Sequence, residues 1–424
     1  MTATAPHPST LLDAISYEDL YRRWERGNWR ASELDFTQDG VQWRETFTEI
    51  ERRAALWNYA LFFHGEDSVT DNLSPYIDAA PRKEQKYFLT TQQVDEARHA
   101  VFFGRFMREV VEAGDDVASS LEATRPELTW GFRHVFARLD RMADELRADR
   151  SRPKLAAAVA LYHIVIEATM AQPGQHFIER YLEQRELLPG FREGMANVAA
   201  DEQRHIAFGV KLISDLQHED PECAAAIGEI LREVQPWTTA VFVPPGFDRS
   251  YTEVFDFTLE DIFAEGAQSL ETKMRSAGLP LDSLPGGSPI PTDLTPFERA
   301  QRGIMLLQAG IVGEKHGPPS RDPEVVATFF DQMRRSVDES AGPFTLQWDF
   351  RDADPWHIVI DDGATRALPG RSSAPDVTFG CTWEEWVDIS MGRVDGRRAV
   401  LSGRLRMKGH PRALLRVPGV FSRS

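Results

Sequence analysis

The feature that most constrains this chain is a short charged pattern that occurs twice. Residues 95–102 read DEARHAVF and residues 201–208 read DEQRHIAF, so both follow Asp-Glu-x-Arg-His-x-x-Phe, 106 positions apart. In each copy the Glu and the His are three residues apart, and residues at this spacing share one face of an α-helix. Each copy can therefore direct one carboxylate and one imidazole to a common point beside its helix.

Apolar residues continue both faces, which indicates that the charged pairs point inward. The first face holds Leu89, Gln92, Glu96, His99 and Phe103, and the second holds Val198, Glu202, His205 and Leu212. A carboxylate that is buried without a partner costs several kcal/mol, whereas a bound metal ion removes this cost. The pattern therefore predicts that Glu96, His99, Glu202 and His205 are metal ligands.

Two further acids complete a known ligand set. Glu167 is the only acid in the apolar stretch AVALYHIVIEATM, and Glu66 lies in ALFFHGEDSVTDNL, where Asp67 is a rival that can equally serve a turn. Two Glu-x-x-His helices and one Glu from each of two other helices form the ligands of dinuclear carboxylate bundles. Four carboxylates and two imidazoles suit iron or manganese better than structural zinc.

Other polar residues near the motifs have weaker interpretations. Asp95 and Asp201 precede the ligand glutamates, and one or both can hold a ligand histidine by its second ring nitrogen. His163 is four residues before Glu167, and we expect it to be a core or supporting residue rather than a seventh ligand. The alternative for the whole motif is two surface faces on which Arg98 and neighbouring acids form ion pairs. The repetition of five matching positions favours the metal.

The sequence divides into two parts with different periodicity. Residues 1–278 are mostly helical in pattern, with long apolar-periodic segments at 45–64, 83–111, 154–182 and 191–216, and this predicts an all-α bundle. Residues 279–293 are rich in Pro, Gly and Ser and read as an exposed linker. Residues 294–424 begin with two helices, 294–310 and 323–340. They then alternate with period two at 344–350, 356–360 and 401–407, which predicts an α+β domain with an antiparallel sheet.

Composition argues against several classes of binding partner and site. The net charge of −18 argues against nucleic acid, because phosphate binding needs clustered Lys and Arg. The only two cysteines, Cys223 and Cys381, are too few and too far apart for a disulfide framework or a thiolate zinc site. No run of 18 apolar residues and no signal-like N-terminus occurs, so we expect a cytoplasmic protein without an integral membrane segment.

The order of the predicted ligands resembles the ferritin-like small subunit of ribonucleotide reductase and its relatives, over about residues 40–275. The stretch KYFLTTQQVDEARHAVFF is especially similar. Reductase subunits usually carry a radical tyrosine seven residues after the first Glu-x-x-His glutamate, where this chain has Phe103. The sequence resembles more closely a related branch, the ligand-binding oxidases.

That resemblance has several implications. It implies a Mn/Fe or Fe/Fe cofactor, O₂ as the oxidant, a fatty-acid-like ligand, a homodimer, and an ether cross-link between Val69 and Tyr162. From spacing alone Tyr162 lies about 140° around an ideal helix from Glu167. It reaches the site only from a distorted helix or along a neighbouring one.

The stretch TWEEWVDISMGRVDGRRAVLSGRLRMKG resembles the sterol-carrier-protein family, over about residues 322–424. This resemblance implies an apolar tunnel for a lipid. Together the two halves predict an O₂-activating dinuclear metal oxidase or oxygenase that acts on or binds a lipid-like ligand. The alternatives are a dinuclear iron oxygenase for a soluble small molecule, a non-enzymatic lipid carrier or metal-binding protein, and a reductase radical subunit, which Phe103 disfavours.

Overall fold

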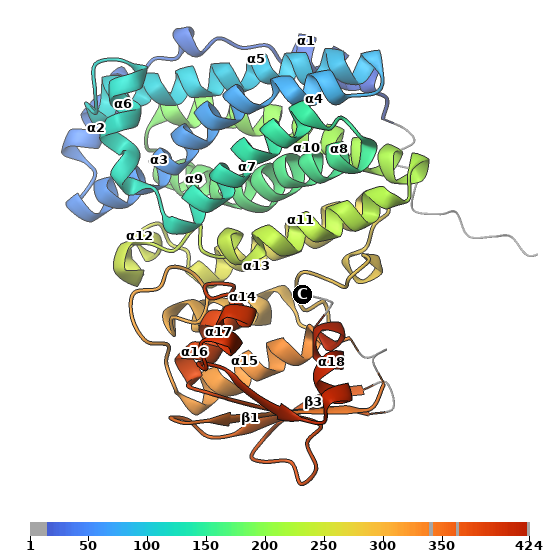
Figure 1. The fold of residues 1–424 in the computed structure, drawn as a ribbon. Helices are drawn as coiled ribbons and strands as arrows, with labels where there is room; N and C mark the ends of the chain where they lie inside the picture. The colour runs from blue at the N-terminus through green and yellow to red at the C-terminus, as the bar shows by residue number, and fades with distance from the viewer. Residues whose placement is uncertain (1–14, 339–341, 362–363, 422–424) are drawn as a thin grey trace, which may run out of the picture. The chain divides into compact units, whose positions relative to one another are not determined.

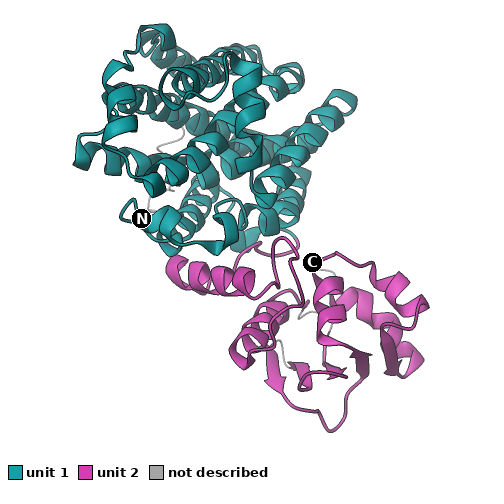
Figure 2. Cartoon of the chain, turned by 90° about the vertical axis from the view of Figure 1, so that its left-hand side faces the viewer, with its two compact units in different colours: residues 1–285 teal, residues 286–424 magenta. Residues whose placement is uncertain are grey.

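The chain forms two compact units. The computed structural model describes residues 15–338, 342–361 and 364–421. Unit 1 is Met1–Pro285 and unit 2 is Gly286–Ser424 (Figure 2). The boundary lies inside the predicted linker, residues 279–293. The first part of that stretch is not exposed, because Leu281 and Leu284 are buried and the short 3₁₀ turn at Leu281–Ser283 packs against a helix of unit 1.

Unit 1 is a bundle of helices (Figure 1). Its long segments are α3 (Glu49–Asn72), α5 (Lys83–Phe106) with the π-helical turn Met107–Val111, the continuous run α8 (Arg152–Val159), η5 (Ala160–Ala171) and α9 (Gln172–Arg185), and α10 (Pro189–Glu219). The other α-helices are α1 (Tyr17–Arg26), α2 (Thr37–Glu45), α4 (Ser74–Ala79), α6 (Val117–Thr124), α7 (Trp130–Ala148), α11 (Glu222–Thr238), α12 (Ser250–Glu253) and α13 (Leu259–Ser276). Short 3₁₀ turns occur at Ala31–Glu33, Arg125–Glu127 and Pro245–Phe247. The all-helical architecture predicted for this half is confirmed.

Local sequence signals set where the long helices begin. Thr48 caps α3 by accepting a hydrogen bond from the backbone N–H of Glu51, whose side chain returns to the cap, as in a capping box. Ser151 caps α8 in the same way through Lys154 N–H, with a proline in the first turn. These caps set the first residues of α3 and of the continuous helix that runs from α8 into η5, and both helices project side chains into the bundle.

The central helices approach one another closely. A Cβ built on Gly209 of α10 would lie 2.3 Å from the Cβ of His163 on η5, so only glycine fits there. Phe191 of α10 packs with ring centroids 4.4 Å from both Tyr59 of α3 and Phe106 of α5. Aromatic packing and a glycine contact thus hold α3, α5, η5 and α10 around one interior.

The segment Arg152–Arg185 is the one helix among the described residues that is long and apolar enough to cross a membrane, and 83% of its most apolar window is buried. A core helix of a bundle passes the same test of length and composition. Its burial against α10, α11 and α13 is that of a core helix.

Unit 2 is an α+β unit, as predicted. Its sheet has the order β3-β2-β1-β4-β5, with strands β1 (Phe344–Phe350), β2 (Trp356–Asp361), β3 (Ala364–Pro369), β4 (Val377–Cys381) and β5 (Arg406–Gly409). The helices are α14 (Pro296–Gln308), α15 (Pro323–Arg335), α16 (Trp383–Ser390), α17 (Gly396–Leu401) and α18 (Pro411–Val420). Alternate residues of β1, such as Leu346 and Trp348, are fully buried in the core that these helices cover.

Two predictions for unit 2 are wrong. The sheet is mixed, because β1 pairs with β4 in parallel, and period-two alternation does not encode strand direction. The predicted strand 401–407 is the end of a helix and the start of a strand. Asp395 caps α17 through Arg398 N–H, Gly403 leaves the helix with φ of 74°, and β5 begins only at Arg406. A glycine in the left-handed region ends a helix and cannot be seen in an alternation pattern.

Candidate metal centre

Six side chains from four helical segments meet inside unit 1. Glu66 lies on α3, Glu96 and His99 on α5, Glu167 on η5, and Glu202 and His205 on α10, and all are buried. Potential ligand atoms form two groups, each within 4.8 Å. The first group is Glu66, Glu96, His99 and Glu202, and the second is Glu96, Glu167, Glu202 and His205. Glu96 and Glu202 belong to both groups. Asp67, the rival of Glu66, belongs to neither.

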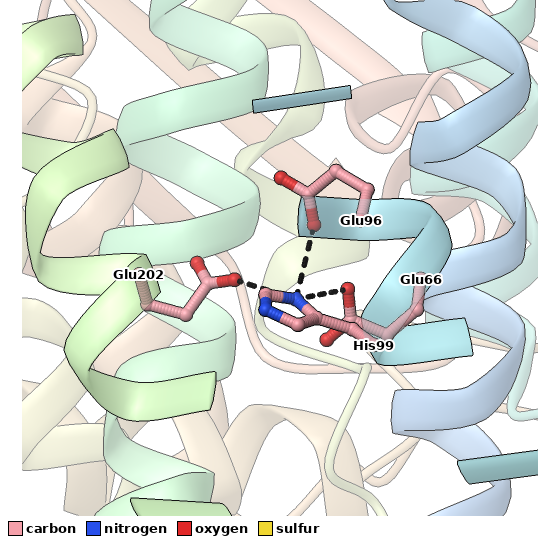
Figure 3. A group of neighbouring side chains, drawn as sticks. All are labelled: Glu66, Glu96, His99 and Glu202. Carbon is pink, nitrogen blue, oxygen red and sulfur yellow. Dashed lines mark hydrogen bonds and ion pairs between the residues drawn. The ribbon is translucent and has the colours of Figure 1, made fainter. Parts of the chain in front are cut away.

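The first group surrounds Nδ1 of His99. This nitrogen lies 3.3 Å from Glu66 Oε2, 3.3 Å from Glu96 Oε2 and 3.6 Å from Glu202 Oε1. In Figure 3 the three carboxylates approach the imidazole from three sides and from three different helices. Three acidic oxygens and one ring nitrogen around a small space form a donor set for a divalent cation.

The second group surrounds Nδ1 of His205. It lies 3.2 Å from Glu96 Oε1, 3.6 Å from Glu167 Oε1 and 3.7 Å from Glu202 Oε1. Glu96 therefore presents Oε2 to one histidine and Oε1 to the other. A carboxylate that faces both groups can bridge two ions.

The second ring nitrogens explain why the aspartates accompany both motifs. His99 Nε2 lies 3.2 Å from Asp201 Oδ2, and His205 Nε2 lies 3.2 Å from Asp95 Oδ2. Each copy of the motif thus supplies the aspartate that orients the histidine of the other copy. With Nε2–H donating to the aspartate, each ring is held with Nδ1 toward the glutamates.

Two arginines tie these aspartates together. Arg98 contacts both Asp95 and Asp201, and Arg204 does the same at 3.0 and 2.7 Å. Both guanidinium groups are about nine-tenths buried. The surface ion-pair interpretation of the motif is therefore wrong, because these pairs lie inside the bundle. The sequence did contain a sign of this buried network, because an arginine occupies the same position in both copies of the motif.

Two tryptophans on the N-terminal segment were not predicted from sequence. Trp24 Nε1–H donates to Asp95 Oδ1 and Trp29 Nε1–H donates to Asp201 Oδ2, each at 2.9 Å. Residue spacing carries no signal for them, since they lie about 70 and 170 residues from their partners. They add a neutral donor to each aspartate, so that both carboxylates are held from several sides.

Burial dominates the electrostatics of three carboxyls. It raises the pKa of Glu66 to about 8, and it also raises the pKa of Glu167 and Glu202, with the neighbouring carboxylates adding to the effect. Like charges in a dry interior disfavour ionisation. Without a cation the raised pKa values favour the protonated forms of these groups, and a divalent ion displaces such protons.

The remaining three groups shift in the opposite sense. Burial alone would raise the pKa of Glu96, but His205 and His99 outweigh burial and hold it well below its usual range. Burial alone would lower the pKa of each histidine, but the facing carboxylates raise both values well above normal. Glu96 and the two imidazoles thus favour one another's charged forms in the metal-free protein.

Several atoms of the cluster lack a hydrogen-bond partner. They are Glu167 Oε2, Glu202 Oε2 and His205 Nδ1, all buried. His205 Nδ1 is close to Glu96 Oε1 but does not meet hydrogen-bond geometry. Buried polar atoms without partners are rare in folded proteins, and here all three are good ligands for iron or manganese. The residues present therefore fit a dinuclear centre.

The π-helical geometry of η5 resolves the position of Tyr162. Its hydrogen bonds join residues five apart, so Tyr162 and Glu167 fall on one face, whereas an ideal α-helix would separate them. Tyr162 Oη–H donates to Glu96 Oε1 at 2.6 Å. Burial and the neighbouring carboxylates raise the pKa of this phenol well above 10, so it stays protonated. η5 is thus the distorted helix from which Tyr162 can reach the site, as expected from the sequence.

A cavity of about 50 Å³ adjoins the cluster. Val69 and Tyr162 both line it, together with Glu66, Glu96, Glu167 and Glu202. Its apolar walls come from Leu61, Phe62, Phe132, Phe136, Ile166 and Met170, among others. The carboxylate cluster thus borders a pocket with a mostly apolar lining.

Gln92 connects the cluster to His163. Its amide nitrogen donates to Glu167 Oε1 at 2.8 Å and to Tyr162 Oη at 3.0 Å. Its carbonyl oxygen lies 3.1 Å from His163 Nε2. Because burial lowers the pKa of His163 to about 3, the ring is neutral and donates from Nε2. This fixes the amide so that its N–H groups face the site.

We expect the Gln92→Leu substitution to destabilise the metal-free protein by about 1–3 kcal/mol, because it leaves buried partners unpaired. Urea unfolding monitored by circular dichroism measures this. The neighbouring Gln93→Leu is the control, since Gln93 is only half-buried, and it should cost less than about 1 kcal/mol. Equal effects of the two substitutions would contradict the role of Gln92.

The family comparison decides where unit 1 belongs. The family model described as "Ribonucleotide reductase, small chain" matches residues 13–236, more than half of the 424 residues. The chain belongs to this family. The family described as "SCP-2 sterol transfer family" matches residues 333–422, within unit 2. Both family resemblances predicted from the sequence are confirmed, and so is the ferritin-like plus sterol-carrier-like fold.

Solved structures resemble the chain over about two thirds of its length. One is a variant of an R2-like ligand-binding oxidase with an anaerobically reconstituted Mn/Fe cofactor. It is 25% identical, with a TM-score of 0.51, covering 65% of this chain and 96% of that chain. Another, from Sulfolobus acidocaldarius, is an R2-like ligand-binding oxidase that is 23% identical with a TM-score of 0.52, covering 67% and 94%. Neighbours within the family therefore carry Mn/Fe, and this chain has a buried Glu/His cluster able to hold metal.

Proposed function

We propose that unit 1 is an O₂-dependent oxidase or oxygenase that holds a dinuclear Mn/Fe or Fe/Fe centre and acts on or binds a lipid-like ligand. The observation that carries the proposal is the pair of overlapping donor groups, which share Glu96 and Glu202 and border an apolar cavity. The ligands would be Glu66, Glu96, His99, Glu167, Glu202 and His205. When bound, such a metal pair supplies O₂ reduction and the power to remove hydrogen from an unreactive C–H bond.

The chain's own residues prepare the site for this chemistry. Asp201 and Asp95 fix the histidine rings, so that each Nδ1 already faces the glutamates before an ion arrives. Tyr162 holds its proton toward Glu96. The pocket walls beside the cluster are mostly apolar, which limits the polar groups that an oxidising centre meets there.

The cavity favours an apolar ligand over a soluble polar one. Its described polar lining consists of four glutamates and Tyr162, with no Lys or Arg among the lining residues. In the proposed centre these glutamates would be taken up as metal ligands, and the remaining apolar walls suit a hydrocarbon chain.

A Val69–Tyr162 ether cross-link is part of the proposal. Its formation joins a side-chain carbon of Val69 to Tyr162 Oη, releases one hydrogen atom from each, and passes two electrons to O₂. The placement of both residues on one cavity wall supports it. We expect peptide mass spectrometry of protein loaded with reduced metal and exposed to air to show the two peptides joined, less two hydrogen atoms.

The Tyr162→Phe variant is the matched control for this cross-link. It keeps the ring but lacks the oxygen, so it should bind metal normally and give only separate peptides. Separate peptides from the unsubstituted protein, at full metal content, would contradict the cross-link and leave the metal centre in place.

The function itself is tested by O₂ uptake. Metal-loaded, reduced protein should consume O₂ and change its visible absorption on exposure to air, and organic extraction of the purified protein should yield an acyl or sterol-like molecule. A non-enzymatic lipid carrier would yield lipid but show no O₂ uptake. A cytoplasmic location and a homodimer are further parts of the proposal, and sedimentation of the purified chain measures the latter.

A further inference from the structure

The end of unit 2 carries a basic segment in an otherwise acidic chain. Residues 396–416 contain Arg397, Arg398, Arg404, Arg406, Lys408, Arg412 and Arg416 and no acidic residue, whereas the whole chain has a net charge of −18. This segment, the basic edge, comprises α17, the edge strand β5 and the start of α18. Figure 1 shows its two helices, α17 and α18, in red.

Most of these cations have no acidic partner. Arg404 pairs with Glu385 and Arg416 lies over the Phe344 ring. The other five, Arg397, Arg398, Arg406, Lys408 and Arg412, are exposed and form no ion pair among the described residues. Elsewhere some exposed arginines pair with an acid, as those at 22, 147 and 185 do, and others such as Arg23 and Arg133 also form no ion pair among the described residues, so the distinction of this segment is its run of cations without any acid. Five unpaired cations in one segment leave positive charge for an external partner.

The same segment exposes two large aliphatic side chains. Leu401, the last residue of α17, is 87% exposed and Leu415 on α18 is 83% exposed. They are the most exposed of the large hydrophobic residues in the described chain. Val400, beside Leu401, is 42% exposed. Aliphatic groups placed among cations need a partner that offers both anions and hydrocarbon.

We propose that the basic edge docks unit 2 on membranes that contain anionic lipid. Lipid headgroups attract the five cations, and Leu401 and Leu415 enter the boundary between headgroups and acyl chains. Nucleic acid is the other polyanion to consider. Single strands are bound through stacking on aromatic rings, and residues 396–416 contain no Phe, Trp or Tyr. Duplexes offer phosphate but no hydrocarbon for the leucines.

The proposal goes beyond the metal centre and does not depend on it. Docking through this edge would bring the sterol-carrier-like unit to a source of apolar molecules. The interaction is electrostatic at first contact, so it should weaken as salt shortens the Debye length.

Vesicle flotation of the full-length protein tests the proposal. We expect the protein to float with vesicles of phosphatidylcholine containing phosphatidylglycerol, and not with phosphatidylcholine alone. Raising the salt from about 0.1 M to about 0.5 M should release it. Replacing the five unpaired cations by Gln should lower the vesicle affinity about tenfold or more.

Two further variants separate charge from hydrocarbon contact. Leu401→Ser with Leu415→Ser should weaken binding at unchanged charge. The control replaces five exposed, paired arginines of unit 1 by Gln, at positions 22, 30, 125, 147 and 185. It changes the net charge equally and should bind within about twofold of the parent.

Three results would overturn the proposal: no flotation with anionic vesicles, equal flotation with both lipid compositions, or equal binding by the five-Gln variant and the control. Binding to an oligonucleotide without binding to vesicles would assign the edge to nucleic acid instead. An unchanged affinity of the double-Ser variant would overturn insertion of the leucines.

Discussion

Glu96→Ala is expected to abolish loading of both metal ions, whereas Glu66→Ala and Glu167→Ala should each abolish only one. Glu96 and Glu202 belong to both donor groups, while Glu66 belongs only to the group around His99 and Glu167 only to the group around His205. Removing a shared carboxylate takes a ligand from both ions at once. Elemental analysis after anaerobic loading and desalting gives the metal content of each variant.

The pattern across the variants matters more than any single value. We expect about two atoms per chain for the unsubstituted protein, about one for Glu66→Ala and Glu167→Ala, and close to none for Glu96→Ala. Asp67→Ala is the matched control, since Asp67 neighbours Glu66 but lies outside both groups. If Glu96→Ala kept one ion while Glu66→Ala lost both, the assignment of Glu96 as the shared ligand would be wrong. Circular dichroism of each variant distinguishes lost ligation from lost folding.

The second large effect concerns the buried ion network behind the histidines. Asp201 accepts hydrogen bonds from Trp29, Arg98 and His99 and also pairs with Arg204. Asp201→Ala leaves two buried guanidinium groups to share Asp95. Removing one partner of a buried ion pair costs about 3–5 kcal/mol, so we expect a loss of this size in the free energy of unfolding.

Urea unfolding of metal-free protein measures that loss without interference from ligation. Asp144→Ala provides the contrast, because Asp144 also pairs with an arginine but its side chain is 78% exposed. It should cost less than about 1 kcal/mol. Comparable costs for the two substitutions would mean that the network around Asp201 adds nothing beyond a surface pair.

The ligand residues could be predicted from sequence because short residue spacings and the apolar surroundings of each acid indicate them. Glu96 and His99 are three residues apart, about one helical turn, and Glu167 is the only acidic residue in an apolar stretch. Burial of these groups follows from the apolar residues on the same faces. Such signals need only the 3.6-residue period and the cost of burying charge.

Other features of the site could not be predicted, because they depend on contacts between distant segments. The aspartate of each motif contacts the histidine of the other motif. Predicting these contacts requires knowing that α5 and α10 pack against each other. The π-helical form of η5 could not be predicted from its apolar sequence, since the residues around Tyr162 are compatible with an α-helix as well as with a π-helix. The amide of Gln92 was placed on the inward face, but its bond to His163 depends on how η5 packs.

In unit 2 the misassigned segment had a local cause. Leu401, Leu405 and Met407 alternate with polar residues, so the strand pattern was real. The cap at Asp395 and the left-handed Gly403 end a helix inside that pattern. Strand direction was also out of reach, because the parallel pairing of β1 with β4 depends on the path of the chain between them.

The most direct test of the central claim is the metal content of the full-length protein, purified without chelators and again after anaerobic loading with Mn(II) and Fe(II). The account predicts about two atoms per chain of iron, or of manganese plus iron, since the two motifs build one dinuclear centre. No bound metal after loading of the folded protein would contradict it, and the buried cluster would then need another explanation.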